Sequence, residues 1–573
     1  MQFPPLKKHK TFSNTVFLTE KNCFDGSILA DEPGVFRCLI RKIGNDPDLL
    51  EFERKQNYAA RRTGADDLAL EVILELNSEL PSCNSMRIGI PLSETDGAQK
   101  FTIIYSGAKF RLLANETLLD EDYPFGDPPG TPENHCDIPA EKQPEPQYRT
   151  TPLHCWSPDR LNEWVGDVSV GFFNDEYHIF YLYDRRHHKS KFGHGGHQWA
   201  HITTKDFKTW RDDGLILPCE TQWQTFGTGT PFLLDGKLAL AYGLHTERFL
   251  PAVGTPRGMT WAISEDGIHF TPSRISVEEM TENPSIYNQP DGSWIVYDHG
   301  LLCRAEKWCD FKKVAKKPIP CGTNSALLNS YECPSLFEWG GYYFMLVGFT
   351  GMYRSKSLSF ETFDDLSGNG VDIYDGLKVP MVAPFKNNRM ILSGWLGITG
   401  WGGVLGIREL VWFDDAIPGI RWLEEAMPEI SDLQEVSASV TFSGEHYFEF
   451  TVQPEKTFSV TMEGVGKKIL FSIDPKRKRA TLSTEKECPT LCELGKNWRK
   501  ISAPGFALDH LRNIETPYKV RMMIRNERKW NGCIVDVEIA GCRTLIHYFE
   551  GSHPTSCKVE DSDCRFHSGK IVK

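Results

Sequence analysis

The feature that most constrains the fold of this 573-residue chain is a degenerate repeat in its middle. Five segments share one pattern, in which an apolar strand, a tight polar turn and a strongly apolar strand follow one another. Successive copies, measured at Phe172, Phe232, Ile286, Leu336 and Ala383, lie 60, 54, 50 and 47 residues apart, and four are followed by a second predicted hairpin. Four-stranded units at such a period are typical of propeller blades, so the sequence predicts a five-bladed β-propeller over about residues 153–430. The segments are residues 170–184, 231–243, 285–298, 335–349 and 383–395.

The sequence on both sides of the repeat also has the character of β-strands. Short β-type runs between about residues 12 and 125 predict an N-terminal β-sandwich, and alternation at period two over about 436–573 predicts a C-terminal one. Residues 126–152, between the first sandwich and the repeat, are rich in proline and glutamate and are predicted to form a linker. The expected fold class is therefore all-β: a five-bladed β-propeller flanked by an N-terminal and a C-terminal β-sandwich.

Composition narrows the classes of function. The formal net charge of −13 argues against nucleic-acid binding, which calls for a basic face. No stretch approaches 18 uninterrupted apolar residues, which argues against a membrane partner. The N-terminal residues lack the apolar core of a signal peptide, so we expect a cytoplasmic protein if Met1 is the true start, and a secreted one if the N-terminus is incomplete. The oligomeric state is left open.

The 16 cysteines are scattered and form no Cys-x-x-Cys pair. Several lie inside apolar runs, among them Cys38, Cys303 and Cys533, which favours free buried thiols over a structural metal site. We expect neither a metal nor an organic cofactor.

Polar residues precede the first strand of several repeat units. Asp167, Asn283 and Glu332 lie five, three and four residues before the reference position of their units. In a propeller such positions face one mouth of the central channel, although a single carboxylate at a strand start is more often a cap or a solvated turn residue. Two convergent carboxylates suit cleavage of a glycosidic bond, where one protonates the leaving oxygen and the other stays ionised. An apolar setting favours the protonated form of a carboxylic acid, which suits Glu332 to the acid role.

These motifs, in this order, resemble those of glycoside hydrolase family 32, the group of invertases, levanases and inulinases. The stretch around Asp167 is similar to the family's first motif, and Glu332, Cys333 and Pro334 reproduce its Glu-Cys-Pro motif. Further matches are residues 197–210, 226–229, 394–395 and 408–410. The resemblance covers about residues 150–573 and implies a five-bladed propeller followed by a β-sandwich. It also implies that Asp167 is the nucleophile and Glu332 the acid/base, and that substrate contacts come from Trp164, Phe226, Thr228, Glu282, Cys333 and Trp395. Tyr374, which precedes the first strand of the fifth repeat unit, is predicted to contact the substrate because of that position.

Several positions depart from the family pattern. They are Glu282-Asn283-Pro284 in place of Arg-Asp-Pro, Gly166 in place of Asn, Val168 in place of Pro and Leu182 in place of Gln. The amide of Asn283 can still bind sugar hydroxyls, so Asn283 stays in the predicted catalytic set. It lacks the charge of an aspartate, and charge-assisted hydrogen bonds are roughly twice as strong as neutral ones.

The sequence therefore predicts a retaining glycoside hydrolase that acts on a fructofuranoside or a related furanoside, with carbohydrate as its binding partner. Three alternatives stay open: an inverting hydrolase similar to an arabinosidase or xylosidase, a fructosyltransferase, and an inactive carbohydrate-binding protein. The separation of the two carboxyl groups distinguishes the retaining from the inverting hydrolase, because retention needs about 5–5.5 Å and inversion about 6.5 Å or more.

Overall fold

The computed structural model describes the backbone of nine strands between Thr15 and Asp122 and, with side chains, most residues from 143 onward. The backbone alone is also described at 185, 245, 298, 301 and 313–315. The residues described with their side chains are 143, 145–159, 163–184, 197–218, 225–244, 258–273, 275–277, 280, 284–297, 302–312, 333–348, 351–367, 371–398, 400–491, 504–526, 532–560 and 565–572.

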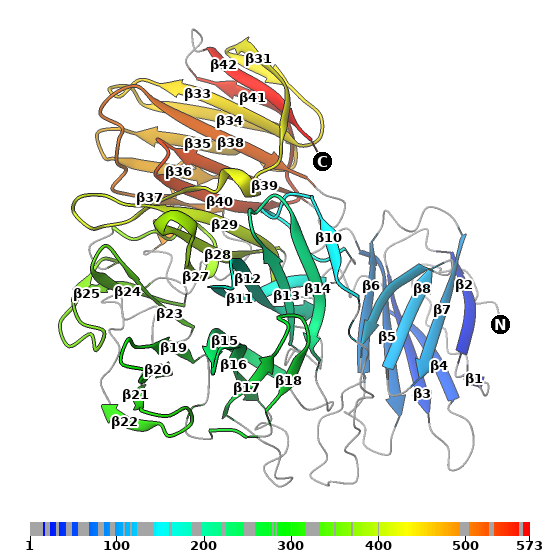
Figure 1. Ribbon diagram of the computed structural model, residues 1–573. Coiled ribbons are helices and arrows are strands. Elements are labelled where there is room, and N and C mark those ends of the chain that lie inside the picture. The colour runs from blue at the N-terminus through cyan, green and yellow to red at the C-terminus, as the bar shows by residue number, and fades with distance from the viewer. Residues whose placement is uncertain are drawn as a thin grey trace.

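The N-terminal strands form two sheets, as the predicted sandwich requires (Figure 1). One sheet has the order β1–β4–β3–β5–β6 and the other β2–β7–β8–β9. β3 and β5 run parallel, whereas the other paired strands are antiparallel. The bounds are β1 Thr15–Phe17, β2 Cys23–Leu29, β3 Gly34–Arg41, β4 Leu49–Lys55, β5 Leu68–Asn77, β6 Ser85–Pro91, β7 Ala98–Ser106, β8 Lys109–Ala114 and β9 Thr117–Asp122.

The repeat forms five antiparallel blades of four strands each, which confirms the predicted architecture (Figure 1). A strand from the predicted linker, β10 (Gln147–Arg149), pairs with the outer strand of the first blade. The first three blades consist of β11 Glu163–Phe173, β12 Glu176–Arg185, β13 Gln198–Thr204 and β14 Trp210–Leu217; β15 Thr225–Leu234, β16 Lys237–His245, β17 Gly258–Ser264 and β18 Phe270–Pro272; and β19 Ser285–Asn288, β20 Trp294–Asp298, β21 Leu301–Ala305 and β22 Lys312–Ala315. The last two consist of β23 Pro334–Trp339, β24 Tyr342–Val347, β25 Gly351–Ser355 and β26 Asp364–Asp365; and β27 Lys378–Phe385, β28 Arg389–Gly397, β29 Gly403–Val411 and β30 Gly419–Trp422.

The tight polar turns of the repeat have a backbone reason. A two-residue hairpin turn that matches the twist of its strands needs positive φ at both central residues, which favours Asn, Asp and Gly. The turn between β11 and β12 has Asn174 at φ 52° and Asp175 at φ 63°, and that between β15 and β16 has Asp235 at 50° and Gly236 at 78°. Turn chemistry thus fixes the register of the hairpins that carry the inner strands.

The ring of blades is closed between its first and last members. Val165 of β11 pairs with Gly403 of β29, and this pairing joins the first and fifth blades into one nine-stranded sheet. The inner strands β11, β15, β19, β23 and β27 contact one another in turn around the ring, and β27 returns to β11. The residues that precede these strands in the sequence are thereby gathered around one axis.

The C-terminal sandwich consists of two six-stranded sheets and lies against the propeller, where β40 contacts β28 and β30 (Figure 1). The sheet orders are β31–β42–β33–β38–β39–β40 and β32–β41–β34–β35–β36–β37. The bounds are β31 Ile430–Ser437, β32 Ser439–Thr441, β33 His446–Val452, β34 Phe458–Val465, β35 Ile469–Asp474, β36 Arg479–Ser483, β37 Gly505–Leu508, β38 Tyr518–Arg525, β39 Gly532–Ile539, β40 Arg543–Glu550, β41 His553–Val559 and β42 Arg565–Ile571.

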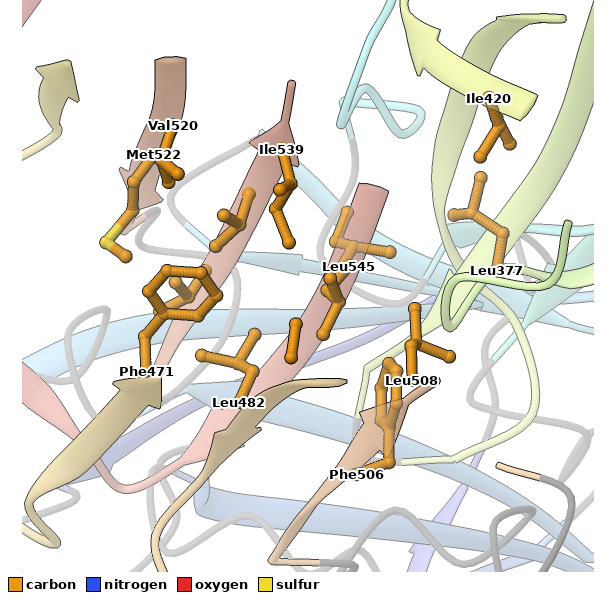
Figure 2. Close-up of a cluster of buried hydrophobic side chains, with 14 of the residues drawn as sticks. Leu377, Ile420, Phe471, Leu482, Phe506, Leu508, Val520, Met522, Ile539 and Leu545 are labelled. Carbon is orange, nitrogen blue, oxygen red and sulfur yellow. The ribbon is translucent and has the colours of Figure 1, made fainter. Parts of the chain in front are cut away.

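The sandwich shares its hydrophobic core with the propeller. Figure 2 shows Phe471 and Leu482 of one sheet facing Met522 and Leu545 of the other, and all four are buried. Leu377, next to β27 of the last blade, belongs to the same cluster. The predicted alternation thus places one face of each sheet in a core that continues into the propeller.

A buried ionic cluster also joins the two domains. Arg408 of β29 is 0% exposed and donates from Nε to Asp375 Oδ2 and from Nη2 to Asp536 Oδ1 of β39, each at 2.9 Å. His154 Nε2 lies 2.6 Å from Asp536 Oδ2, and the backbone N–H of Ile407 donates to His154 Nδ1. Burial, followed by the charge of Arg408, lowers the pKa of His154, so the imidazole is neutral between these partners.

Helical structure in the described residues includes two 3₁₀ turns, η4 (Lys386–Asn388) and η5 (Glu424–Ala426). No helix in this part of the chain has both the length and the apolar character needed to cross a membrane. Cys303 and Cys533 are buried, as the sequence predicts, while the side chain of Cys38 lies outside the described residues.

We expect the substitution Arg408→Met to lower the free energy of unfolding by about 3–5 kcal/mol, because it leaves two buried carboxylates without their cation. Urea denaturation measures this change. The control is Arg421→Met, which removes a half-exposed partner of Glu409 and should cost less than about 1 kcal/mol. Equal effects of the two substitutions would show that the cluster does not hold the domains together.

Acid should destabilise the protein through His178, whose pKa is lowered to about 3 by burial and, secondarily, by the charge of His201. The unfolded chain takes up this proton near pH 6.5, so stability is lost as the pH falls from there towards 3. The slope is about 1.4 kcal/mol per pH unit for one proton. We expect His178→Gln to reduce the slope of unfolding free energy against pH by about this amount between pH 4 and 6.

Candidate active site

A β-bulge positions Asp167 in the innermost strand of the first blade. Val165 pairs with Tyr183 and Val168 with Tyr181, so Gly166 and Asp167 together lie opposite a single residue of β12. A bulge of this kind bends the strand and changes the direction of a side chain. The carboxylate of Asp167 can therefore leave the plane in which the flanking valines pack.

The same irregularity recurs at the equivalent place in two other blades. In β15 the register shifts between Phe226 and Gly229, and in β27 it shifts between Lys378 and Met381. Val379, inside the second of these, has φ 46°, a left-handed conformation that is strained for a β-branched residue. Strain of this kind persists where the surrounding structure enforces it, often at functional sites.

The side chains of four blades meet at the Asp167 carboxylate. Thr228 Oγ1 of the second blade donates to Oδ2 at 2.8 Å, and Trp395 Nε1 of the fifth donates to Oδ1 at 2.8 Å. Cys333 Sγ, at the start of the fourth blade, lies 3.7 Å from Oδ2 and 3.4 Å from Thr228 Oγ1. All four residues are buried, with Asp167 8% exposed. Donors to both oxygens favour the ionised carboxylate and fix its orientation.

The structure thus brings Thr228, Cys333 and Trp395 together around Asp167, as expected for residues of one site. Phe226 lies in the core between the first two blades, where its ring packs on Tyr242 at a centroid distance of 5.0 Å. Trp164 is 3% exposed within β11. These two aromatic side chains pack in two different hydrophobic clusters of the protein.

Tyr374 is not part of the group around Asp167. Its hydroxyl donates to the carbonyl oxygens of Val347 and Gly351 in the fourth blade, and burial raises its pKa well above the ordinary value. The backbone carbonyl of Tyr374 accepts from Arg543 of the sandwich. In the described structure Tyr374 therefore connects the last blade to its neighbours.

Three predicted residues, Glu282, Asn283 and Glu332, lie outside the described residues. Their neighbours in the sequence are described. Cys333 follows Glu332 and contacts Asp167, and Pro284 follows Asn283 and accepts a hydrogen bond from Thr230 Oγ1 at 2.6 Å.

Two residues near Asp167 were not anticipated. Lys378, 7% exposed, places its ammonium 4.9 Å from the ring centroid of Trp395. Trp401 lies at the turn between β28 and β29, with its ring centroid 5.3 Å from that of Trp395. The available signals were a single lysine in an apolar stretch and a tryptophan flanked by glycines, and neither specifies a site without the fold.

Among the described residues, no group of three or more His, Cys, Asp or Glu side chains is arranged to hold a metal ion. The chemistry that the described site offers is that of one oriented, buried carboxylate in the innermost strand of the first blade.

The sequence places this site in a known class of domain. Residues 162–356 match the family model described as the glycosyl hydrolases family 32 N-terminal domain, a segment that contains Asp167, Thr228 and Cys333. The resemblance to family 32 is thereby confirmed over this segment.

The matched proteins are described as a levanase and as β-fructofuranosidases. Over 88 residues the chain is 31% identical to the levanbiose-producing levanase of Bacillus subtilis (strain 168), a match that spans 15% of this chain and 16% of the levanase. The fold is similar to that of a family 32 β-fructofuranosidase of Bombyx mori, with a TM-score of 0.55, 14% identity and coverage of 74% of this chain and 94% of the other. The fold is also similar to that of the β-fructofuranosidase of Schwanniomyces occidentalis, with a TM-score of 0.54, 12% identity and coverage of 74% of this chain and 98% of the other.

Thr228→Val should disable the site without disturbing the fold, because it removes a hydroxyl donor from a buried carboxylate while keeping the shape of the side chain. A hydrogen bond to a charged group contributes about 1.5–3 kcal/mol, so we expect kcat/KM to fall by roughly 10- to 150-fold. Thr260→Val is the control, since Thr260 is also buried in the second blade but donates to the carbonyl of Ile275. Steady-state kinetics on the substrates considered below measure both variants.

Proposed function

We propose that this protein is a retaining glycoside hydrolase that cleaves a fructofuranoside or a closely related furanoside. The observation that carries the proposal is the Asp167 carboxylate, which is buried, held by donors on both oxygens and contacted by residues of three other blades. A carboxylate that is ionised, poorly hydrated and fixed in direction is suited to direct attack on an anomeric carbon.

The reaction would proceed in two displacements. Asp167 attacks the anomeric carbon while Glu332 donates a proton to the leaving glycosidic oxygen, which departs as an alcohol. Glu332, now ionised, takes a proton from water, and the resulting attack on the anomeric carbon releases the sugar and restores both carboxyl groups. Glu332 adjoins Cys333 in the sequence, and Cys333 contacts Asp167, which supports the pairing of these two acids.

Asn283 and Glu282 would contact sugar hydroxyls from the third blade. The bond from Thr230 to the carbonyl of Pro284 supports this placement, because it ties the residue after Asn283 to the strand that carries Thr228. The furanoside class is supported by the family 32 match and by relatives described as a levanase and as β-fructofuranosidases.

Asp167→Asn and Glu332→Gln should each lower kcat by at least about 1000-fold, because each removes a group that acts in bond cleavage. The measurement is product analysis on sucrose, inulin, levan and arabinofuranosides, compared with the unsubstituted protein. Asp175→Asn is the matched control, since Asp175 belongs to the same hairpin but lies at its exposed turn.

Two outcomes would contradict the proposal. Turnover that survives the substitution Asp167→Asn would show that Asp167 is not the nucleophile. Saccharide binding without any turnover by the unsubstituted protein would indicate a carbohydrate-binding protein. Retention is tested separately by NMR of the first-formed anomer, because inversion would release the opposite one.

A further inference from the structure

The loop at residues 371–376, which leads into β27 of the last blade, is bound by the C-terminal sandwich. Arg543, the first residue of β40, donates from Nη1 to the carbonyl oxygen of Asp372 at 2.7 Å and from Nη2 to that of Tyr374 at 2.9 Å. Arg543 and Tyr374 are both buried. Because the guanidinium presents several donors in a rigid plane, one side chain fixes the loop backbone at two points.

The same strand binds the next residues of the loop. Thr544 Oγ1 donates to Asp375 Oδ2 at 2.7 Å, and the backbone N–H of Ile546 donates to the carbonyl oxygen of Asp375 at 2.8 Å. Gly376 has φ 115°, a conformation that favours glycine, and a Cβ there would overlap the carbonyl oxygen of Ile546. The loop and β40 are therefore in direct backbone contact.

Tyr374 extends this contact to the fourth blade. Its hydroxyl lies 3.0 Å from the carbonyl oxygen of Gly351 and 3.3 Å from that of Val347. Val347 is opposite Gly351 of β25 on one side and opposite Pro334 of β23 on the other. The hydroxyl thus holds the fourth blade where β24 ends, level with the residue at which β23 begins.

Cys333, immediately before β23, has an uncommon backbone conformation. Its φ is 53°, in the left-handed region that residues other than glycine seldom adopt. Its carbonyl oxygen accepts from the backbone N–H of Gly348, which follows Val347, at 3.5 Å, and its thiol contacts Asp167 Oδ2. Such a conformation persists where the surrounding structure enforces it. The end of β24 that Tyr374 holds is one part of those surroundings.

We propose that Arg543 is a positioning residue, through which the C-terminal sandwich holds the backbone next to Glu332, the proposed general acid. The φ angle of Cys333 sets the direction of the planar peptide group that joins it to Glu332. A general acid acts within about 2.6–3.2 Å of the oxygen that it protonates, and misplacement by about 1 Å can cost roughly 100-fold in rate. The inference rests on the proposed function and gives the sandwich a part in it.

The test compares two substrates whose leaving groups differ in their need for a proton. One is the saccharide that the protein cleaves among sucrose, inulin and levan, whose leaving alcohol must be protonated. The other is the 4-nitrophenyl glycoside of the same sugar, which releases a stable phenolate. We expect Arg543→Met to lower kcat/KM by roughly 10- to 100-fold on the saccharide and by less than about 3-fold on the aryl glycoside. Arg543→Lys should restore part of the loss, because an ammonium can donate to the same carbonyl oxygens.

Tyr374→Phe tests the same connection from its other end and leaves the bonds of Arg543 to the loop backbone in place. It removes the hydroxyl that reaches Val347 and Gly351, and we expect a selective loss on the saccharide of roughly 3- to 10-fold. Because both residues act through one loop, the loss in the double variant should be smaller than the product of the two single losses. If Arg543→Met protein does not fold, as its melting temperature would show, Tyr374→Phe decides the question.

Arg512 is the matched control. It also joins the sandwich to the last blade, where it donates to the carboxylate of Asp415 at 2.9 Å and to the carbonyl oxygen of Ile417 at 3.4 Å. Both acceptors lie just before β30, the outer strand of that blade. Arg512→Met should therefore leave the ratio of the two kcat/KM values unchanged.

The failure of this inference differs from the failure of the proposed function. Equal losses on both substrates, or no loss, in folded Arg543→Met or Tyr374→Phe protein overturn the positioning role and leave the hydrolase. Glu332→Gln should show the selective loss most strongly, and its absence there overturns both the acid role of Glu332 and the positioning role of Arg543. Absence of turnover by the unsubstituted protein overturns the hydrolase together with this inference.

Discussion

The pairing of Val165 with Gly403 is the contact on which the geometry of the site depends. It closes the ring between the first and last blades, and the regular strand pairing ends next to it on both strands. On β11 the next two residues form the bulge that carries Asp167, and on the other side the turn before Gly403 carries Trp401. The indole of Trp401 therefore lies against Gly166, the residue before Asp167, although Gly166 and Trp401 are more than 200 positions apart in the sequence.

The bulges explain how a propeller can present polar groups without losing its packing. Strands that are buried on both faces consist mainly of apolar residues, so a carboxylate or a hydroxyl is unfavourable there. Val165 and Val168 of β11 are fully buried. The extra residue in β11 and in β15 turns Asp167 and Thr228 away from that packing and towards each other. Local irregularity, repeated at one level of the ring, thereby creates a site that the regular blades would exclude.

Much of the fold could be predicted from the sequence, because a tight turn between two apolar strands needs Asn, Asp or Gly and repeats at the length of a blade. Asp167, Thr228, Cys333 and Trp395 could be found by their place at blade starts and by resemblance to family motifs. The bulges could not be predicted from the sequence, because they depend on the register between paired strands. Tyr374 shows the same limit, because its position before the fifth repeat unit gave no sign that its hydroxyl bonds to the fourth blade.

The positions of the charged groups Lys378 and Asp167 on either side of Trp395 follow from the pairing of β27 with β28 and from the bulge in β11. Lys378 begins β27 beside the strained Val379, and its ammonium lies over the face of Trp395, while the N–H edge of that indole donates to Asp167. A cation at the ring face and a carboxylate at the N–H edge are each attracted by the part of the indole that they meet. Opposite charges are thus placed on either side of one fixed ring, which offsets part of the cost of burying both. The strained backbone at Val379 is consistent with this arrangement, because it holds Lys378 at the start of the strand whose neighbour carries Trp395.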